Sequence, residues 1–365
     1  RVSRGLGDVY KRQTWDVSHK VNLGYSAQIK RDKTAWRMSA NNPTTNIYDN
    51  HDVAVPDNAY FGGNYSDPLT TARNRTQGWL FSDTLGFFSD RVLFTAAARH
   101  QKVVVRNYSN ATGLEDTSSR YTQSRWMPTF GLVYKPWEEV SLYANHTEAL
   151  QPGSNAPKEA TNFGQSTGIA RSKQNEVGVK VDFERVGGSL ALFEIKKPSA
   201  MLNSENYYAL DGEQRNRGVE LNVFGEPMLG LRLNGSTTWL SPELTKTKNG
   251  TNDGKDAIGV SNFYMVMGAE YDIQPVEGLT ATARVRHTGS QFADAANTKK
   301  LDSYTTLDLG VRYRMRMNAD QNTMVWRVGV DNVTNEKYWS SVESNGTYIF
   351  QGQSRTLKAS LTYDF

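Results

Sequence analysis

Strict alternation of apolar and polar side chains is the feature of this sequence that most limits its fold. The stretch NEVGVKVDFE, Asn175–Glu184, places an apolar residue at every second position, with polar residues or glycine between them. Because successive side chains of a β-strand point to opposite faces, this pattern predicts a strand whose two faces meet different surroundings. The stretches 281–288, 307–314 and 357–365 alternate in the same way.

Similar segments recur along the whole chain. We recognise about 14 of them, each of roughly 8 to 12 residues, which is the length that a tilted strand needs to cross a bilayer. No segment keeps a helical period, and no apolar run reaches the roughly 18 residues of a membrane helix. Hydrophobic residues make up only 38% of the sequence, while it contains 30 Gly and 18 Tyr, as a sheet with one wet face requires. An all-β fold is therefore predicted.

The connections between these segments alternate in length. Short turns are expected at 87–91, 135–139, 184–188, 225–230 and 274–278. Long polar loops are expected at 31–72, 107–122, 151–172, 197–214, 241–260, 290–303 and 334–353. Outer-membrane barrels have this arrangement, with short periplasmic turns and long extracellular loops, whereas a soluble β-sandwich has no reason to sort its loops by length.

Aromatic residues end the segments that run toward the short turns. The residues are Phe87, Tyr134, Phe183, Tyr271, Tyr313 and Phe365. Rings at one depth form a girdle at a membrane interface, although aromatics also favour strands in general. Unpaired backbone groups cost several kcal/mol in hydrocarbon, so such a sheet must close on itself. The sequence thus predicts a transmembrane antiparallel β-barrel.

The sequence offers little for catalysis, for metal binding or for nucleic acid. GQSTG, around Ser166, matches the G-x-S-x-G sequence of a nucleophile elbow. That elbow lies between a strand and a helix, whereas here a polar loop precedes the motif and a predicted strand follows it, so catalysis by Ser166 is not expected. The five His lack zinc-site spacing, and there is no Cys. The net charge of +4 is too small to indicate a protein that binds nucleic acid. We expect no enzyme, no metal site and no cofactor.

Basic residues gather on the polar faces of several predicted strands. They are Lys180, Arg284, Arg286, Arg312, Arg314, Arg316 and Arg327. Inside a barrel they would give a positive lumen suited to anionic ligands. Alternatively, they neutralise facing acids such as Glu176, Glu220, Glu270 and Asp308. The sequence supports both interpretations equally.

Aromatic residues also occur in the long polar loops. They are Tyr60, Phe61, Tyr65, Tyr207, Tyr208, Trp339, Tyr348 and Phe350. An aromatic ring with polar groups nearby is a good platform for a ligand. The alternative is that these rings pack the loops against one another.

The C-terminal region resembles the end of TonB-dependent outer-membrane receptors, particularly ferric-siderophore receptors. The family ends with an N-(L/V/I)-(T/F)-(D/N)-x-x-Y element, a loop, a G-x-(P/S)-R turn and a last strand with an aromatic terminus. Here Asn332 and Tyr338 fit the first element, Gly352 and Arg355 fit the turn, and Phe365 is the terminal residue. The resemblance extends from about Ser18 to Phe365.

The resemblance implies a receptor of the Gram-negative outer membrane that binds a ferric siderophore and imports it with energy from the TonB system. Iron would arrive already coordinated, so no resident cofactor is implied. The expected ligand contacts are Tyr60, Phe61, Tyr207, Tyr208, Arg284, Arg286, Trp339, Tyr348 and Phe350. A hydroxamate siderophore is preferred within the family. Outer-membrane lipid and the barrel-assembly machinery are further expected partners.

Several parts of the family pattern are not matched by this chain. Members carry a plug domain and a TonB-binding segment before a barrel of about 22 strands. We therefore interpret residues 14–365 as the C-terminal portion of such a barrel and residues 1–13 as a leader that is not native. Two other classes stay open on sequence grounds: a passive 14-strand channel and a soluble β-sandwich binding module.

The chain ends in the middle of the last alternating segment. In barrels of this family the last strand pairs with the first, and a terminal aromatic resembles the signal that the assembly machinery recognises; Tyr363 and Phe365 would supply it here. We expect Phe365→Asp to lower the amount of receptor in the outer membrane sharply, as measured by quantitative blotting of outer-membrane fractions. Unchanged insertion would remove this assignment.

Overall fold

The protein is almost entirely β-structure in the computed structural model, which describes residues 2–14, 17–41, 43–44, 46, 48, 52–317, 322–343, 346 and 348–364. The strands are β1 (Val2–Thr14), β2 (Val17–Lys33), β3 (Trp36–Ser39), β4 (Asn58–Gly62), β5 (Thr70–Phe87), β6 (Val92–Tyr108), β7 (Glu115–Trp137), β8 (Val140–Pro152), β9 (Ile169–Phe183), β10 (Val186–Leu202), β11 (Tyr208–Met228), β12 (Leu231–Lys246), β13 (Phe263–Asp272), β14 (Leu279–Thr288), β15 (Gln291–Phe292), β16 (Lys300–Leu301), β17 (Tyr304–Arg316), β18 (Thr323–Asp331), β19 (Trp339–Val342), β20 (Ile349–Gln351) and β21 (Thr356–Asp364). One short 3₁₀ turn, η1 (Lys248–Gly250), is the only helical element among the described residues. None of their helices is long and apolar enough to span a membrane.

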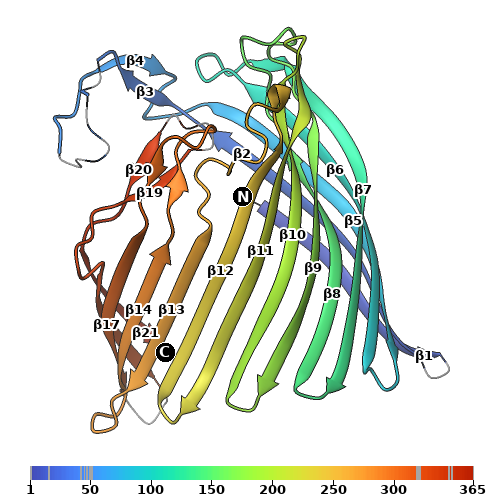
Figure 1. The fold of residues 1–365 in the computed structure, drawn as a ribbon, viewed down its shortest axis with the longest axis vertical. Coiled ribbons are helices and arrows are strands. Elements are labelled where there is room, and N and C mark those ends of the chain that lie inside the picture. The colour runs from blue at the N-terminus through green and yellow to red at the C-terminus, as the bar shows by residue number, and fades with distance from the viewer. Residues whose placement is uncertain are drawn as a thin grey trace. The chain divides into compact units, whose positions relative to one another are not determined.

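The long strands form one antiparallel ladder of 15 members in the order β1-β2-β5-β6-β7-β8-β9-β10-β11-β12-β13-β14-β17-β18-β21 (Figure 1). Without β1, which contains most of the residues interpreted as a leader, 14 strands remain, as the alternation predicts. That residues 1–13 are not native stays a prediction. The chain divides into two compact units, which we describe separately. Unit 1 comprises residues 1–132, 146–173 and 197–212, and unit 2 comprises 133–145, 174–196 and 213–365.

Several strands are longer than the 8 to 12 residues expected from the sequence. β5 has 18 residues, β7 has 23 and β11 has 21. As a result, two of the expected long loops, 107–122 and 197–214, are short, because the flanking strands continue to 108 and 115 and to 202 and 208. Cross-strand hydrogen bonds satisfy the backbone equally well beyond a bilayer, so the ribbons extend past the roughly 25 Å that lipid requires.

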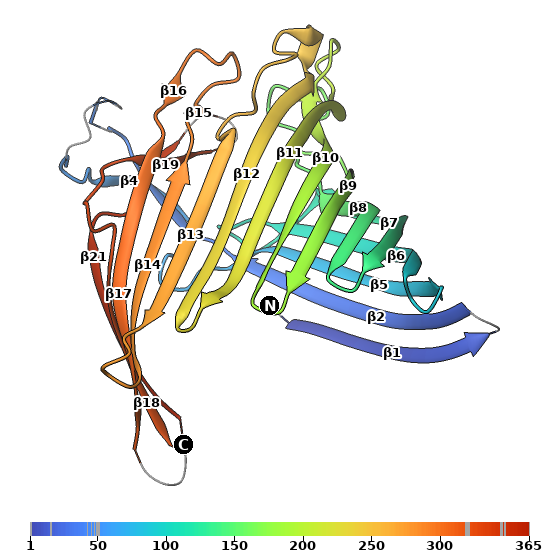
Figure 2. The same cartoon turned by 60° about the horizontal axis from the view of Figure 1, so that its bottom comes forward.

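The other long connections of unit 2 lie at one end of its strands. They are 247–262, 289–303 and 332–355, and they contain η1, the hairpin β15–β16 and the hairpin β19–β20. Figure 2 labels β15 and β16, and Figure 1 labels β19 and β20, at the end of the sheet that is opposite to the β11–β12 turn. The predicted sorting of connections by length therefore holds in unit 2.

Strand register gives unit 2 one apolar and one polar face. On neighbouring strands, Ala283 faces Leu309 and Arg284 faces Asp308. Leu309 on the apolar face is 43% exposed, whereas Asp308 on the polar face is 6% exposed. A soluble protein would bury the leucine and solvate the aspartate. This reversal places lipid against the apolar face and a polar interior behind the other face.

Aromatic side chains mark two levels on the apolar face. Tyr271 and Tyr313 lie near the short turns, as predicted, and are 41% and 36% exposed. Trp239 and Phe263 lie toward the loops, with ring centroids 5.6 Å apart. A strand tilted by about 45° rises about 2.3 Å per residue across a bilayer, so the step from Leu231, opposite Tyr271, to Trp239 spans about 19 Å. These two levels therefore have the spacing of aromatic girdles.

The last strand, β21, pairs with β18 on one side and ends the strand order. Tyr363 lies on its apolar face opposite Met324 and is 46% exposed. Phe365 lies outside the described residues. The role of both residues in barrel assembly stays a prediction.

The assignment of the apolar face of unit 2 to lipid can be tested at Met267. This residue lies on the apolar face of β13, midway between the two aromatic levels, and is 47% exposed. We expect Met267→Arg to lower the free energy of unfolding in bilayers by about 2 to 4 kcal/mol, because a charge would face hydrocarbon. Guanidinium titration of the reconstituted full-length receptor measures it. Ser236→Arg, at nearly the same depth on the polar face of β12, is the control and is expected to cost much less. Equal costs would contradict the assignment of the faces.

Candidate functional site

Three connections of unit 2 pack together above the strands. Ala293, Leu301 and Val342 form a buried cluster, and Ile258, Trp339 and Ile349 pack against it. The backbone adds contacts between the connections: the Gly259 amide donates to the Phe292 carbonyl at 2.9 Å. Because the three connections share one small hydrophobic core, they form a single packed surface at this end of unit 2.

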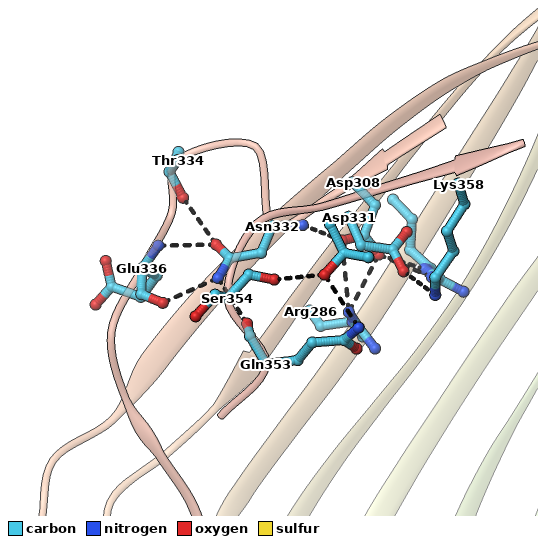
Figure 3. Close-up of polar contacts among 11 residues, drawn as sticks. Arg286, Asp308, Asp331, Asn332, Thr334, Glu336, Gln353, Ser354 and Lys358 are labelled. Carbon is cyan, nitrogen blue, oxygen red and sulfur yellow. Dashed lines mark hydrogen bonds and ion pairs between the residues drawn. The ribbon is translucent and has the colours of Figure 1, made fainter. Parts of the chain in front are cut away.

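Asn332 fixes the base of the β18–β21 connection (Figure 3). Its side-chain amide donates to the backbone carbonyls of Glu336, at 2.9 Å, and Gln353, at 3.0 Å, so it ties the two ends of the connection together. Its Oδ1 accepts from the Glu336 amide at 2.8 Å. Its own backbone amide donates to Asp308 Oδ1 at 2.9 Å, which anchors the base to β17. Asn332 is 2% exposed and has a φ of 51°, a left-handed conformation that asparagine tolerates better than most residues.

The other motif residues complete this base. The Gly352 amide donates to the Tyr338 carbonyl at 2.7 Å. A Cβ on Gly352 would lie 2.3 Å from the Tyr338 ring, so no other residue fits there without moving the ring. The Arg355 amide donates to Asn335 Oδ1 at 3.0 Å. The C-terminal sequence motif therefore corresponds to one hydrogen-bonded loop base.

Two predicted ligand contacts, Arg284 and Arg286, share the carboxylate of Asp308. Arg284 Nη2 lies 2.8 Å and Arg286 Nη2 3.2 Å from Asp308 Oδ2. The Asp308 side chain is 8% exposed, whereas those of the two arginines are 49% and 42% exposed. One buried carboxylate thus holds two guanidinium groups that still face the polar interior. Because Asp308 also accepts from Asn332, it joins this pair to the loop base.

A recess of about 120 Å³ lies beside Arg286 on the polar face, where Tyr264, Tyr304 and Tyr338 line it. The rings of Tyr304 and Tyr338 are stacked, with centroids 4.0 Å apart and planes 24° apart. Burial, and then the neighbouring Tyr304, raises the pKa of the Tyr338 phenol, so it stays protonated at neutral pH. The recess is smaller than a typical pocket for a whole ligand and can hold only part of one.

A larger groove of about 830 Å³ runs along the polar face of β13, β14, β17, β18 and β21. Arg284, Arg312, Arg327 and Lys358 line it. Gly268 also lines it, and a Cβ there would lie 2.4 Å from the side chain of Asn234. The polar face is therefore hollowed below the loop base.

Both interpretations of the basic residues find support. Arg312 pairs with Glu270 at 3.0 Å, and Lys358 pairs with Asp331. The described strands β12 to β21 nevertheless place more bases than acids on this face. The bases are Arg232, Arg284, Arg286, Arg312, Arg314, Arg316, Arg327 and Lys358, and the acids are Glu270, Asp272, Asp308, Asp331 and Asp364. Neutralisation occurs and leaves an excess of positive charge. On another part of unit 2, Lys180 lies over the Tyr143 ring, 4.9 Å from its centroid.

The predicted aromatic contacts of unit 2 differ in exposure. Tyr348 and Phe350 are 61% and 52% exposed. Trp339 packs against the loop cluster, as the alternative of loop packing predicted. Tyr348 and Phe350 therefore present exposed rings beside this small core, and their contact with a ligand stays a prediction.

The remaining predicted contacts lie in unit 1. Tyr60 and Phe61, on β4, are 52% and 63% exposed. Arg37 stacks on this hairpin, with its Cζ 5.8 Å from the Phe61 ring and 4.7 Å from the Tyr65 ring. Tyr207 is 45% exposed. Tyr208 exchanges two hydrogen bonds between its backbone and the Asn162 side chain, which ties it to the connection at 153–168.

Sequence reasoning missed Tyr264 and Tyr304 as parts of the site. Both lie at the loop end of strands that the alternation predicts, but neither stands in a loop or in the terminal motif. The register that pairs Tyr264 with Thr288, and Thr288 with Tyr304, brings them to one level. Only the pairing of strands reveals this.

The chain matches the sequence model of one family, described as "TonB dependent receptor-like, beta-barrel", over residues 3–333. The chain belongs to this family. It is 48% identical over 368 residues to the ferrichrome receptor FcuA of Yersinia enterocolitica, covering 99% of this chain and 48% of that protein. It is 27% identical to the ferrichrome outer membrane transporter/phage receptor of Escherichia coli K12, covering 97% of this chain and 47% of the relative. The chain thus spans about half the length of these relatives.

Solved structures of two ferric-siderophore receptors have the same fold over the matched part. BauA, the ferric preacinetobactin receptor of Acinetobacter baumannii, matches with a TM-score of 0.77 at 32% identity, covering 100% of this chain and 54% of that one. The ferric-catecholate import receptor Fiu of E. coli K12 matches with a TM-score of 0.71 at 15% identity, covering 99% and 54%. Its likeness concerns the fold alone.

Family membership settles three predictions. The chain is part of the transmembrane β-barrel of a TonB-dependent receptor, its location is the Gram-negative outer membrane, and the family is one of transporters, not enzymes. The alternative of a soluble β-sandwich is wrong.

The loop base of this receptor chain is testable at Asn332. Asn332→Gly keeps the left-handed backbone accessible but removes the side-chain hydrogen bonds to Glu336 and Gln353. We expect opening of residues 332–355 to become easier by about 1 to 3 kcal/mol, because buried backbone groups lose their partners. Hydrogen exchange of the full-length receptor measures it. Asn297→Gly, at another left-handed asparagine in the β15–β16 turn, is the control and should leave exchange at 332–355 unchanged.

Proposed function

We propose that the receptor containing this chain binds a ferric siderophore of the ferrichrome type at its extracellular side and imports it with energy from the TonB system. The 48% identity to the ferrichrome receptor FcuA, over 99% of this chain, carries this proposal. Because that match covers 99% of this chain, it extends over the connections as well as the strands. The structural likeness to the ferric preacinetobactin receptor supports the broader class of ferric-siderophore receptors.

The polar face of unit 2 offers chemistry that suits such a ligand. The hydroxamate oxygens that hold Fe³⁺ in a ferrichrome-type complex carry negative charge and accept hydrogen bonds. Arg284 and Arg286 present half-exposed guanidinium groups, and Tyr338 keeps its phenol protonated. Together they form a wall of donors at the loop end of the polar face. No covalent step is needed, because the iron remains coordinated throughout.

The exposed loop aromatics add apolar contact area. Tyr348 and Phe350 in unit 2, and Tyr60, Phe61 and Tyr207 in unit 1, present large rings to solvent. We include Tyr208 and Trp339 as residues that hold loops in place, because each is tied to neighbouring loop residues. We expect coupling to TonB to use the TonB-binding segment that members of this family carry, and insertion to use the assembly machinery through the terminal aromatics.

A binding panel with the purified full-length receptor tests the ligand class. The panel holds ferrichrome, ferrioxamine B, a ferric catecholate and iron-free ferrichrome. We expect ferrichrome to bind most tightly, as measured by quenching of intrinsic fluorescence. Tightest binding of the catecholate would replace the ferrichrome type with another siderophore. Binding of no ferric siderophore, with uptake of a vitamin or sugar instead, would overturn the iron assignment.

Arg286 is the sharpest single test of the polar wall. Arg286→Gln removes one charged donor while Asp308 keeps Arg284 as a partner. A hydrogen bond from a charged group contributes about 1.5 to 3 kcal/mol, so we expect the Kd for ferrichrome to rise by about tenfold or more. Arg314→Gln is the matched control, because Arg314 lies on the same face near the short turns, opposite Val325. An equal effect of both variants would indicate general electrostatics, not contact with Arg286.

A further inference from the structure

A groove of about 940 Å³ lies on the apolar face of unit 2, across β9, β10, β11, β12 and β13. Val177, Leu192, Val219, Trp239 and Phe263 line it. Val177, Leu192 and Trp239 are 51%, 52% and 46% exposed, so the groove is open to the surroundings. Val219 faces Trp239, and Trp239 faces Phe263, which places these three on the face that meets lipid.

Three charged residues stand together at the loop end of this groove. Arg217 Nε donates to Glu194 Oε2 at 2.7 Å, and Lys196 Nζ lies 3.6 Å from Glu194 Oε1. Glu194 and Arg217 also line the groove. The side chains of Arg217 and Lys196 are 56% and 47% exposed. With two cations on one carboxylate, this charged cluster carries a net charge of +1.

The register sets the depth of the charged cluster. Arg217 pairs with Ser241, two residues beyond Trp239 on β12. At about 2.3 Å of depth per residue, the cluster lies about 5 Å above the loop-side aromatic level and about 23 Å from the level of Tyr271. That is the edge of a hydrocarbon band of about 25 Å, where lipid headgroups begin. The cluster therefore lies at headgroup level and the groove lies at acyl-chain level.

We propose that this groove and its charged cluster form a binding site for an acylated, phosphorylated lipid of the outer leaflet. An acyl chain lies along Val177, Leu192 and Trp239, and the phosphate accepts hydrogen bonds from Lys196 and Arg217. Glu194 holds both cations in position through these two ion pairs. The geometry favours a lipid over a soluble anion, because the apolar groove continues directly beneath the cations.

Charge also distinguishes this site from an ordinary surface ion pair. Exposed ion pairs contribute about 0 to 1 kcal/mol to stability, and charges that face lipid are unfavourable away from the interface. A net positive cluster at the interface gains instead from an anionic headgroup, at about 1 kcal/mol per cation near the surface. The sign of the net charge therefore predicts the preferred lipid.

The full-length receptor, reconstituted in phosphatidylcholine vesicles, tests the site through Trp239. Phosphatidylglycerol with brominated acyl chains is the anionic probe, and brominated phosphatidylcholine is the neutral one. The Trp239 signal is the difference between the wild-type receptor and Trp239→Phe. We expect the anionic lipid to quench Trp239 at about fivefold lower mole fraction than the neutral lipid, as one net charge predicts.

Two variants of the charged cluster should shift this preference in opposite directions. Glu194→Gln leaves a net charge of +2 and is expected to strengthen the preference for the anionic lipid by about fivefold. Lys196→Gln combined with Arg217→Gln leaves −1 and is expected to abolish or reverse it. Lys248→Gln combined with Lys255→Gln removes two exposed loop charges and should change nothing. Equal quenching by both lipids in the wild-type receptor, or shifts of both cluster variants in the same direction, would overturn the proposal.

Discussion

The hydrogen-bonding requirement of the backbone in lipid underlies everything else in this chain. No water is present in hydrocarbon to satisfy an unpaired amide or carbonyl, so each strand that crosses must pair on both sides along its membrane-spanning length. In the described part of the chain, a continuous antiparallel ladder meets this requirement for every member except β1 and β21, which end the strand order and pair on one side. Once the pairing of the strands is fixed, the two-residue period of a strand determines which face of the sheet each side chain occupies. Where an apolar residue faces lipid, the residues directly before and after it face the polar side.

The consequences for function follow from that division. The polar face can concentrate charge that no lipid-facing surface would accept, and in unit 2 it carries arginine pairs around acids such as Asp308. Asp308 connects two levels of the structure, because it holds Arg284 and Arg286 and also accepts the amide of Asn332. The loop that carries Tyr348 and Phe350 is thus fixed to the same carboxylate that holds the candidate donors Arg284 and Arg286. A ligand that meets these arginines meets a surface whose loop base is already ordered.

The apolar face is not uniform either. Its aromatic levels and the charged cluster at Glu194 lie where a bilayer changes from hydrocarbon to headgroups. The same strands therefore contact a wet interior with one face and lipid with the other, and the side chains on the two faces differ accordingly. Between the two register shifts of this strand pair, at 214–225 on β11 and 233–244 on β12, the odd or even number of a residue decides whether its substitution acts on the lipid-facing side or on the interior.

The sequence by itself determined the all-β class, the assignment of side chains to faces, the sorting of connections by length in unit 2 and the residues of the terminal motif. It could do so because alternation is local and needs no knowledge of neighbours. It misjudged strand ends, since pairing continues in water beyond the bilayer, where no hydrophobic pattern marks it. Only the tertiary structure decided which arginine meets which acid, that Trp339 packs against other loops, and that Tyr264, Tyr304 and Tyr338 share one recess. Those contacts depend on strand register and on residues far apart in the chain, and a side chain's sequence neighbours do not encode its partner on the next strand.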